Sequence, residues 1–510
     1  MSASEPHTQP PRLYTRALLG LTAHPVTVEC HVGSGLPSTT IVGLPEAAVR
    51  ESRDRVRSAI RNSGFDYPDG AVVINLAPGG LSKSSSALDL PIAVSVLAAT
   101  RQIHSEHLAG YEFLGELGLF GGLRPISGAL ACALASSKAG RRLVIPMDNQ
   151  TEACVAPSNA VCLASTLQEV ASAMNSSKVS LAEPRSQQTQ APASGGGFDQ
   201  VIGQHAAKRA LVIAAAGGHH ILMVGPPGTG KTMLARGFSE LLPELTPQNS
   251  LEVAAIYSAA GLTRPDYAAV PIREPHHSAS APALVGGGNP PMPGEIALAH
   301  HGVLFLDELP HFKPSALNLL REPIESGIAV IARAKYKVTF PCRFQLVAAM
   351  NPCPAGRTCS EDACRCTSIQ VQRYQSRISG PMLDRIDIQV SVPALPQALL
   401  AKLERQPRSS STNDLRRNID AARQIQLDRQ GRLNSLLNGE RLLAEMAAAD
   451  LDGNFLEQAI DRYNLSARSY HKLWRIARTI ADVENEHTIG LPHMTEAMSY
   501  RALDWEAGLA

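Results

Sequence analysis

The order of apolar and polar residues along the chain predicts alternating strands and helices in its first third. Between residues 11 and 173, short apolar runs at Val26–Val32, Ala71–Leu76 and Arg142–Ile145 have the character of β-strands. Longer stretches have the periodicity of helices, and these cover residues 47–62, 88–99 and 128–138. An alternation of this kind predicts an α/β domain.

Two polar stretches divide the rest of the chain. Residues 175–197 are rich in Ser, Gln, Pro and Gly, which predicts a flexible linker. The strand–loop–helix rhythm then returns from Phe198 to about Val392 and predicts a parallel sheet. A second polar break, at 406–414, precedes helical periodicity that continues to the C-terminus. We therefore expect an α/β domain at 11–174, the linker at 175–197, a second α/β domain at 198–393 and a helical region at 394–510.

Composition narrows the class of protein. The 510 residues suggest about three domains, and 47 Lys+Arg against 46 Asp+Glu leave a net charge of +1. Any contact with DNA must therefore be local rather than due to an overall basic field. Five of the nine cysteines fall between Cys342 and Cys366, and the N-terminus lacks the pattern of a signal peptide. The longest apolar stretches are about half a membrane span. We expect a cytoplasmic protein that does not contact membranes.

The clearest chemical motif is a phosphate-binding loop. The sequence GPPGTGKT at 225–232 fits the pattern G-x-x-x-x-G-K-[ST], follows an apolar strand and precedes a helical stretch. In such a loop Lys231 contacts the β- and γ-phosphates, while the Thr232 hydroxyl is a ligand of Mg²⁺. ATP and Mg²⁺ are the expected cofactors. The predicted nucleotide and Mg²⁺ contacts are Gly225, Pro226, Pro227, Gly228, Thr229, Gly230, Lys231, Thr232 and Asp307.

Two further apolar strands end in polar residues that complete this site. The sequence VLFLDE at 303–308 predicts a buried strand followed by Asp307, which would orient the Mg²⁺ shell, and Glu308, which would polarise the attacking water. The alternative is a pair of acids that caps a helix. A third strand, 344–350, ends in Asn351, a neutral amide that suits positioning of water or sensing of the γ-phosphate.

The chain resembles a known family at several long motifs: IVGLPEAAVRES, INLAPGGLSK, GPPGTGKT, GEIALAHHGVLFLDELP, FQLVAAMNPCP and SGPMLDRID. They resemble AAA+ ATPases of the magnesium-chelatase-like group, in its ComM/YifB branch, over almost the whole chain. The resemblance implies a central AAA+ parallel-sheet domain and a C-terminal helical lid. It implies that Asn351 is sensor 1, that Arg468 is sensor 2, and that Arg385 is an arginine finger for a neighbouring subunit's nucleotide. Arg373 and Arg377 are rivals for the finger, and a surface salt bridge is the alternative for each arginine.

A finger supplied in trans requires a subunit junction, so a homo-hexameric ring is expected. The segment VIARAKYKVTF at 330–340 precedes the sensor-1 strand, and its cations Arg333, Lys335 and Lys337 alternate, so that on one strand they would share a face. The resemblance implies a hairpin in the ring's pore that grips nucleic acid, with Tyr336 between the charges. Single-stranded or branched DNA is the expected partner. The alternative is the solvated face of an ordinary hairpin.

A cysteine cluster follows the predicted sensor 1. Cys353, Cys359, Cys364 and Cys366 give the spacing C-x5-C-x4-C-x-C, which in a reducing compartment suggests a structural Zn²⁺ site. Relatives often read CPCG where this chain has CPAG at 353–356. Free thiols or a redox disulfide are the alternatives.

Residues 11–174 resemble the Lon-protease-like fold (ribosomal S5 domain 2-like) that serves as an accessory domain in this branch. The sequence KSSSA at 83–87 lies where active relatives carry a nucleophilic serine. The stretch Pro125–Ser137, where those relatives carry the lysine base, contains no Lys, His or acid, and Lys138 lies beyond it. We therefore expect no peptidase activity and a helix-capping role for Ser86.

These features together favour a ring-forming ATP-dependent motor on DNA, a helicase or branch-migration factor, which in the resembled branch serves natural transformation and recombination. One alternative is a magnesium-chelatase-type ATPase that remodels a partner protein, although the chain lacks a D-x-S-x-S metal-adhesion motif. An ATP-dependent protease is disfavoured by the missing base. A regulator that uses ATP only as a switch is disfavoured by Glu308.

Overall fold

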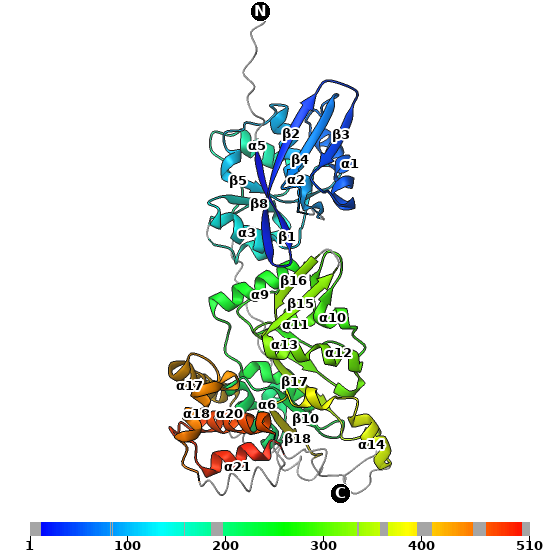
Figure 1. The fold of residues 1–510 in the computed structure, drawn as a ribbon. Coiled ribbons are helices and arrows are strands. Elements are labelled where there is room, and N and C mark those ends of the chain that lie inside the picture. The colour runs from blue at the N-terminus through cyan, green and yellow to red at the C-terminus, as the bar shows by residue number, and fades with distance from the viewer. Residues whose placement is uncertain are drawn as a thin grey trace, which may run out of the picture.

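The computed structural model describes residues 12–81, 83, 85–157, 159–184, 197–333, 336–356, 366–394, 411–451 and 466–501. Figure 1 shows the N-terminal sheet at one end of an elongated molecule, the central α/β region next to it, and the C-terminal helices beside the far end of the central region. None of the helices in the described ranges is long and apolar enough to cross a membrane.

In the described part of the N-terminal region, seven strands form one mixed sheet in the order β3-β4-β2-β1-β5-β8-β9. Strand β2 pairs antiparallel with β1 and β4, and the remaining pairs are parallel. The strands are β1 (Leu13–Leu19), β2 (Thr22–Gly33), β3 (Ser38–Val42), β4 (Ala71–Ala77), β5 (Tyr111–Phe113), β8 (Arg142–Pro146) and β9 (Val161–Ala164).

Helices cover this sheet, and the three that the alternation of the sequence predicts, at 47–62, 88–99 and 128–138, are among them. The helices are α1 (Ala47–Asn62), α2 (Asp89–Ala99), α3 (Ala129–Lys138), α4 (Gln150–Ala153) and α5 (Leu167–Asn175). Helix α1 is amphipathic: Val49, Val56 and Ile60 are buried while its arginines lie on the surface or at its edge. Residues 176–184, which the sequence assigns to a linker, contact this domain, because Leu181 packs on its core and Ala182 pairs with Leu163.

The central region contains a parallel sheet whose strands are buried on both faces. In the described residues five strands pair in the order β11-β14-β17-β10-β18. Ile221 and Met223 face one apolar core, whereas Leu222 and Val224 face another, because successive side chains of a strand point to opposite faces. The strands are β10 (Ile221–Val224), β11 (Ile272–Arg273), β14 (Val303–Leu306), β17 (Gln345–Met350) and β18 (Ile388–Ser391).

Helices on both faces of this sheet, and the C-terminal helices, share its cores. Trp474 and Ile476 of α20 belong to the same buried cluster as Ile221 of β10, so the C-terminal helices pack directly on the central domain. The helices are α7 (His205–Gly217), α8 (Lys231–Gly237), α9 (Pro247–Ala259), α10 (Ala281–Val285), α11 (Glu295–Leu298), α12 (Pro314–Leu319), α13 (Arg321–Ser326), α14 (Ser368–Gln375), α15 (Gly380–Leu383), α17 (Thr412–Gln430), α18 (Gly439–Ala447), α20 (Ala467–Val483) and α21 (Leu491–Ser499).

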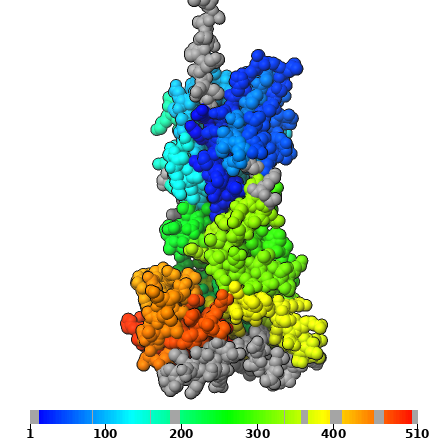
Figure 2. Space-filling model, in the orientation of Figure 1, coloured from blue at the N-terminus to red at the C-terminus, as the bar shows by residue number. Residues whose placement is uncertain are grey.

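The N-terminal and central regions are joined by a packed contact between α3 and α9. Leu130 of α3 lies in one apolar cluster with Val253 and Ile256 of α9. Ser258, near the end of α9, accepts the N–H of Gly128 on its carbonyl oxygen at 2.8 Å and the N–H of Leu130 on its hydroxyl at 3.2 Å. Figure 2 shows the two regions as one continuous surface on this face. The start of α3 is thus capped by the neighbouring region.

Candidate functional site

The loop at 225–232 joins the buried strand β10 to helix α8. Two of its glycines adopt left-handed backbone conformations, since Gly228 and Gly230 have φ of 83° and 90°. Gly225 is required for a different reason: a Cβ there would lie 2.1 Å from the carbonyl oxygen of Val392, just after β18. The curl of the loop therefore depends on its own glycines and on the close approach of the chain after a neighbouring strand.

Lys231 lies in the curl of this loop, and its side chain is 8% exposed. The ammonium group donates hydrogen bonds to the carbonyl oxygens of Gly225 and Pro226, each at 2.7 Å, and to Oδ1 of Asn351 at 3.3 Å. Burial lowers the pKa of Lys231, and the nearby charge of Asp307 opposes that shift. The structure thus places Lys231 next to the amide that the sequence predicts as sensor 1.

The acid pair after β14 faces the hydroxyl group of the loop. Thr232 Oγ1 donates to Oδ2 of Asp307 at 2.8 Å, and Oδ1 of Asp307 accepts the backbone N–H of Glu308, also at 2.8 Å. A hydroxyl and a carboxylate in contact are hard oxygen ligands of the kind that Mg²⁺ binds, often together with phosphate oxygens. The residues at this position therefore fit the predicted Mg²⁺ site.

Glu308 has an unusual backbone and two histidine neighbours. Its φ of 52° and ψ of 47° are left-handed, which is uncommon for a residue with a side chain. Its Oε2 lies 3.6 Å from Nδ1 of His277 and 4.0 Å from Nδ1 of His311. No motif in the sequence predicts a role for these histidines. The pair His276–His277 in a loop of small residues was a signal, but only the fold brings it to Glu308.

Asn351 follows β17, which is the neighbour of β10 in the sheet. Parallel strands end at the same edge, so the amide lies beside the phosphate loop. The phenol of Tyr374, from α14, interacts with the backbone of Asn351, and burial raises the pKa of Tyr374 to about 12. The predicted residues that lie together at this edge are Lys231, Thr232, Asp307, Glu308 and Asn351.

The two arginines predicted for roles in trans and on the lid share one carboxylate of their own chain. Nη2 of Arg385 lies 2.9 Å from Oε1 of Glu325, and Nη2 of Arg468 lies 3.3 Å from the same oxygen. The guanidinium of Arg385 also donates to the carbonyl oxygen of Arg321 at 3.2 Å. Arg373 and Arg377, its rivals, are exposed. Glu325 is a partner that the motif gives no means of identifying.

The hairpin corrects one sequence prediction. Strands β15 (Ile328–Arg333) and β16 (Tyr336–Pro341) pair antiparallel, with Arg333 opposite Tyr336 and Ala332 opposite Lys337. Residues opposite each other share a face and successive residues alternate, so Arg333 and Lys337 lie on opposite faces of the hairpin. The prediction of a shared face is wrong for Arg333 and Lys337 because they lie on two paired antiparallel strands and not on one continuous strand. Lys335 lies outside the described residues.

The face with Arg333 and Tyr336 packs towards the N-terminal region. The hydroxyl of Tyr336 donates to Oε1 of Glu46 at 2.9 Å, and a Cβ on Gly20 would clash with Val338 at 2.3 Å. Val338 and Phe340 on this face are buried, whereas Lys337 on the other face is exposed. Tyr336 is therefore part of a contact between domains in this conformation.

The cysteine cluster is described only in part. Cys353 is buried and Cys366 is partly buried, whereas Cys359 and Cys364 lie outside the described residues. The predicted zinc site stays a prediction from the spacing.

Around Ser86 the structure shows a second correction. The hydroxyl of Ser85, and not that of Ser86, caps the short helix at 86–88, since it accepts the N–H of Ala87 at 3.1 Å. Ser86 is the first residue of that helix, and its hydroxyl donates to Glu116. Lys83 is fully buried and donates to the carbonyl oxygens of Gly43, at 2.8 Å, and Pro78.

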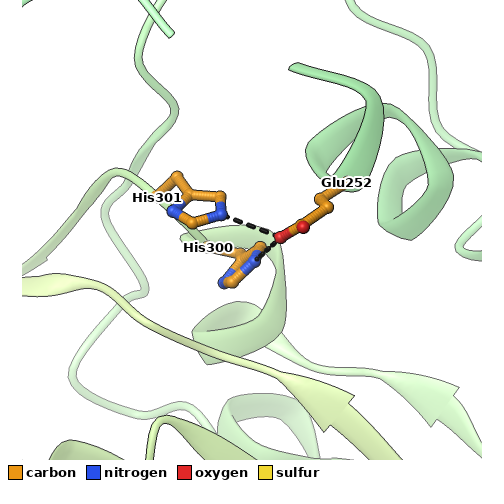
Figure 3. A group of neighbouring side chains, drawn as sticks. All are labelled: Glu252, His300 and His301. Atoms are coloured by element: carbon orange, nitrogen blue, oxygen red, sulfur yellow. Dashed lines mark hydrogen bonds and ion pairs between the residues drawn. The ribbon is translucent and has the colours of Figure 1, made fainter. Parts of the chain in front are cut away.

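A second cluster of titratable groups lies at the opposite end of β14 from the acid pair (Figure 3). Oε2 of Glu252, on α9, is 3.1 Å from Nε2 of His300 and 2.9 Å from Nε2 of His301. Three ligand atoms this close could surround a metal ion.

The protonation of His300 argues for a hydrogen-bonded cluster instead. The backbone N–H of Arg343 donates to Nδ1 of His300 at 3.0 Å, so the proton of the neutral ring is on Nε2 and points to Glu252. A metal ion would need Nε2 as a free electron pair. Burial lowers the pKa of His300 to about 4, which keeps the ring neutral. The cluster links α9 to the start of β14.

Comparison with known proteins agrees with this geometry along the chain. Residues 28–149 match the family model described as subunit ChlI of Mg-chelatase, and residues 197–400 match the model of magnesium chelatase, subunit ChlI. Residues 409–501 match the model of the C-terminal part of that subunit.

Curated relatives cover nearly the whole chain. The chain is 44% identical to the competence protein ComM of Haemophilus influenzae and 44% identical to the uncharacterized protein YifB of Salmonella typhimurium, in each case over 96% of the chain and 97% of the relative. It is 29% identical to the magnesium-chelatase 38 kDa subunit of Rhodobacter capsulatus over 30% of the chain and 50% of that subunit. The chain therefore belongs to the ComM/YifB family of magnesium-chelatase-like proteins, and its central region is that of an AAA+-type ATPase.

Proposed function

We propose that this protein is a ring-forming ATP-dependent motor that acts on single-stranded or branched DNA, as a helicase or branch-migration factor in natural transformation and recombination. The observation that carries the ATPase part is the contact of Thr232 with Asp307 beside the Lys231–Asn351 pair. These contacts join the phosphate loop to the ends of two neighbouring strands, β14 and β17, and make one site from three separate motifs.

The residues divide the hydrolytic work by their chemistry. Lys231 would contact the β- and γ-phosphates, and Thr232 and Asp307 would hold Mg²⁺, which would neutralise phosphate charge. Glu308, whose carboxylate is exposed after β14, would accept a proton from the attacking water. Asn351 would orient the γ-phosphate or the water. His277 and His311 lie 3.6 and 4.0 Å from the same carboxylate oxygen of Glu308 and would help to position it.

The hexamer and the arginine finger are part of the same proposal. Arg385 lies on its own chain against Glu325, so activation of hydrolysis needs its transfer to a neighbour's nucleotide. Arg468 at the start of α20 is proposed as the lid arginine of the same subunit. A ring is the assembly in which every subunit gives and receives one finger.

DNA binding is proposed for the hairpin of β15 and β16. Arg333 ends β15 and Lys337 is the second residue of β16, and both are exposed. The hairpin strands themselves contain no acid, since the nearest acids in the sequence are Glu325 and Glu361, and exposed cations suit contact with phosphates. The name of the ComM relative, a competence protein, supports a role in DNA uptake.

The deciding experiment compares ATPase activity with and without single-stranded DNA, and with an unfolded protein in its place. We expect stimulation by DNA and none by protein. The Arg333→Gln/Lys337→Gln variant should lose the stimulation, whereas Lys178→Gln, at an exposed lysine far along the chain, should keep it. A rate that DNA does not change would contradict the motor function.

A chelatase-type role is the second candidate, because all three family models are those of a magnesium-chelatase subunit. On that hypothesis ATP turnover would respond to a partner protein that carries the metal-adhesion motif and would ignore DNA. The stimulation assay therefore separates the two functions.

We further propose that the N-terminal region is a Lon-protease-like accessory domain without peptidase activity. Ser86 donates to a carboxylate, Glu116, and Lys83 is bound by two carbonyl oxygens. Incubation with unfolded casein and ATP should give no cleavage, and cleavage that Ser86→Ala abolishes would contradict this.

The four cysteines at 353, 359, 364 and 366 are proposed to hold one structural Zn²⁺, which elemental analysis of the purified protein would test.

A further inference from the structure

Helix α1 of the N-terminal domain carries a row of arginines that neither the ATPase site nor the hairpin uses. Arg50, Arg53, Arg57 and Arg61 are all exposed. At about 100° per residue their side chains fall within about 80° of the helix circumference, so they form one stripe. With a rise of about 1.5 Å per residue, the stripe extends about 16 Å along the helix.

Acidic neighbours compensate only part of this charge. Arg53 is bound by Asp54 through two hydrogen bonds of 3.0 and 3.2 Å, and Arg61 lies 4.0 Å from the exposed Asp69. Within the described ranges, neither Arg50 nor Arg57 has an ion pair. The guanidinium of Arg57 instead lies 5.7 Å from the ring centre of Tyr67. The stripe therefore keeps two guanidinium groups without an ion pair, although the charge of Asp54 also acts on Arg57.

A surface hollow of about 160 Å³ opens beside the middle of the stripe. Arg53, Asp54 and Arg57 line one side, and Ser38, Thr39 and Tyr67 line the other, so two guanidinium groups face the hollow beside one carboxylate. The hydroxyls of Thr39 and Tyr67 lie 2.8 Å apart, so one donor of this pair remains to be directed at a ligand. Guanidinium groups together with hydroxyls are the groups that bind phosphate oxygens.

The arginine stripe begins next to the point where β16 of the hairpin begins. Tyr336, the first residue of β16, donates its hydroxyl hydrogen bond to Glu46, the residue immediately before α1. Glu46 is four residues before Arg50 and therefore lies on the same side of the helix, one turn away. The cations at the tip of the hairpin and the arginines of α1 are thus neighbours across the domain junction, as the close approach of the two domains in Figure 1 also shows.

From this continuity we infer that α1 and its hollow bind the phosphate backbone of a DNA strand that also contacts the hairpin. This inference rests on the proposed DNA-motor function and adds a second contact area to it. The stripe is long enough to contact more than one phosphate of a strand. Arg50 and Arg57 contact phosphates directly, and the hollow receives one phosphate between α1 and β3.

The test measures binding of a fluorescent single-stranded oligonucleotide to the full-length protein by anisotropy over a series of salt concentrations. Arg50→Gln/Arg57→Gln should reduce the slope of log K against log salt by about 1.4, since each lost phosphate contact on a single strand accounts for about 0.7. At low salt the affinity should fall on the order of tenfold. Arg50→Lys/Arg57→Lys should keep most of the slope, because the charges remain.

A control variant tests whether the loss of any two exposed arginines changes the salt dependence, or only the loss of these two. Arg417→Gln/Arg432→Gln removes two exposed arginines from the C-terminal helical region and should leave the slope unchanged. Equal thermal unfolding midpoints would show that the variants fold, and Gln is as good a helix former as Arg. The single variants Arg50→Gln and Arg57→Gln, at about 0.7 each, serve if the double variant is unstable.

The outcomes distinguish this inference from the function on which it rests. If the unsubstituted protein binds DNA and the Arg50→Gln/Arg57→Gln variant has the same slope, the inference is wrong and the motor function stands. If the unsubstituted protein does not bind DNA, both are wrong. A reduced slope for the α1 variant together with an unchanged slope for the Arg417→Gln/Arg432→Gln control supports the inference.

Discussion

Two segments of this chain are built from the same local parts and do different chemistry. Strand β10 leads through a glycine-containing loop to Lys231 and a helix, and strand β4 leads through a glycine-containing loop to Lys83 and a helix. Both lysines are buried and donate to backbone carbonyl oxygens. In both, burial lowers the pKa of the lysine.

The difference lies in what the neighbouring strands contribute. Beside Lys231 are the Thr232 hydroxyl at the start of α8 and, just after β14 and β17, the side chains of Asp307 and Asn351. In the described part of the chain, the ammonium group of Lys83 has the carbonyl oxygens of Gly43 and Pro78 as its hydrogen-bond partners, and the nearby Ser86 is bound to Glu116. A strand, a glycine loop and a lysine are therefore not enough for a phosphate site, which also needs neighbouring strands that end in carboxylate or amide side chains.

The largest effect is expected at the proposed arginine finger. On the proposed function, Arg385→Ala should reduce ATP hydrolysis by about 10³–10⁵-fold, while binding of ATP is retained, because a finger in trans would stabilise the transition state at a neighbour's nucleotide. Mixing Arg385→Ala with Lys231→Ala protein should restore some hydrolysis, since each supplies what the other lacks. Absence of recovery in a ring whose assembly has been verified would contradict a finger in trans.

The next largest effect is expected from substitutions at the phosphate-loop site itself. Glu308→Gln should reduce hydrolysis by about 10²–10⁴-fold with ATP still bound, since it removes the proton acceptor. Lys231→Ala should abolish hydrolysis and also weaken binding, because it removes a phosphate contact. Turnover assays with nucleotide-binding titrations measure both. Near-normal turnover of Glu308→Gln would show that another group activates the water.

At the second segment we expect an effect on stability alone. Lys83→Met leaves the carbonyl oxygens of Gly43 and Pro78 without the buried ammonium donor, which costs about 1–3 kcal/mol of the free energy of unfolding. The rate of ATP hydrolysis should stay within about twofold of the original, since Lys83 contacts no part of the ATPase site. Calorimetry and turnover assays on the same preparation test the two halves. A large loss of turnover in a folded variant would contradict the contrast between the segments.

The smallest effect is expected on the pH dependence of stability, and it comes from the cluster of Glu252, His300 and His301 before β14. The pKa of His300 is about 4 in the folded protein and about 6.5 in an unfolded chain, so the unfolded state binds more protons between these values. The contribution of His300 to the free energy of unfolding is fully present above pH 6.5. It is lost as the pH falls towards 4, by about 3 kcal/mol at most. His300→Gln should flatten this dependence in urea unfolding curves, and an unchanged dependence would contradict the buried neutral ring.

The sequence predicts the elements of the fold better than the contacts between them. Helix α1 at 47–62 and the phosphate loop follow from local periodicity and from a motif, both of which are properties of a short segment. The predicted faces of the hairpin were wrong because Arg333 and Lys337 belong to two paired strands, and β16 begins anew at Tyr336 opposite Arg333. Glu325, His277 and Glu116 were missed because their roles come from partners far away in the sequence, which no local pattern records.

The shared carboxylate of Glu325 has a consequence for how two parts of the chain influence each other. Two guanidinium groups lie within 2.9 and 3.3 Å of one oxygen atom, so each is attracted to the anion and repelled by the other cation. When one arginine withdraws, the repulsion disappears and the remaining pair becomes tighter. Release of Arg385, in the loop after α15, would therefore make release of Arg468, at the start of α20, less favourable, and the reverse holds as well.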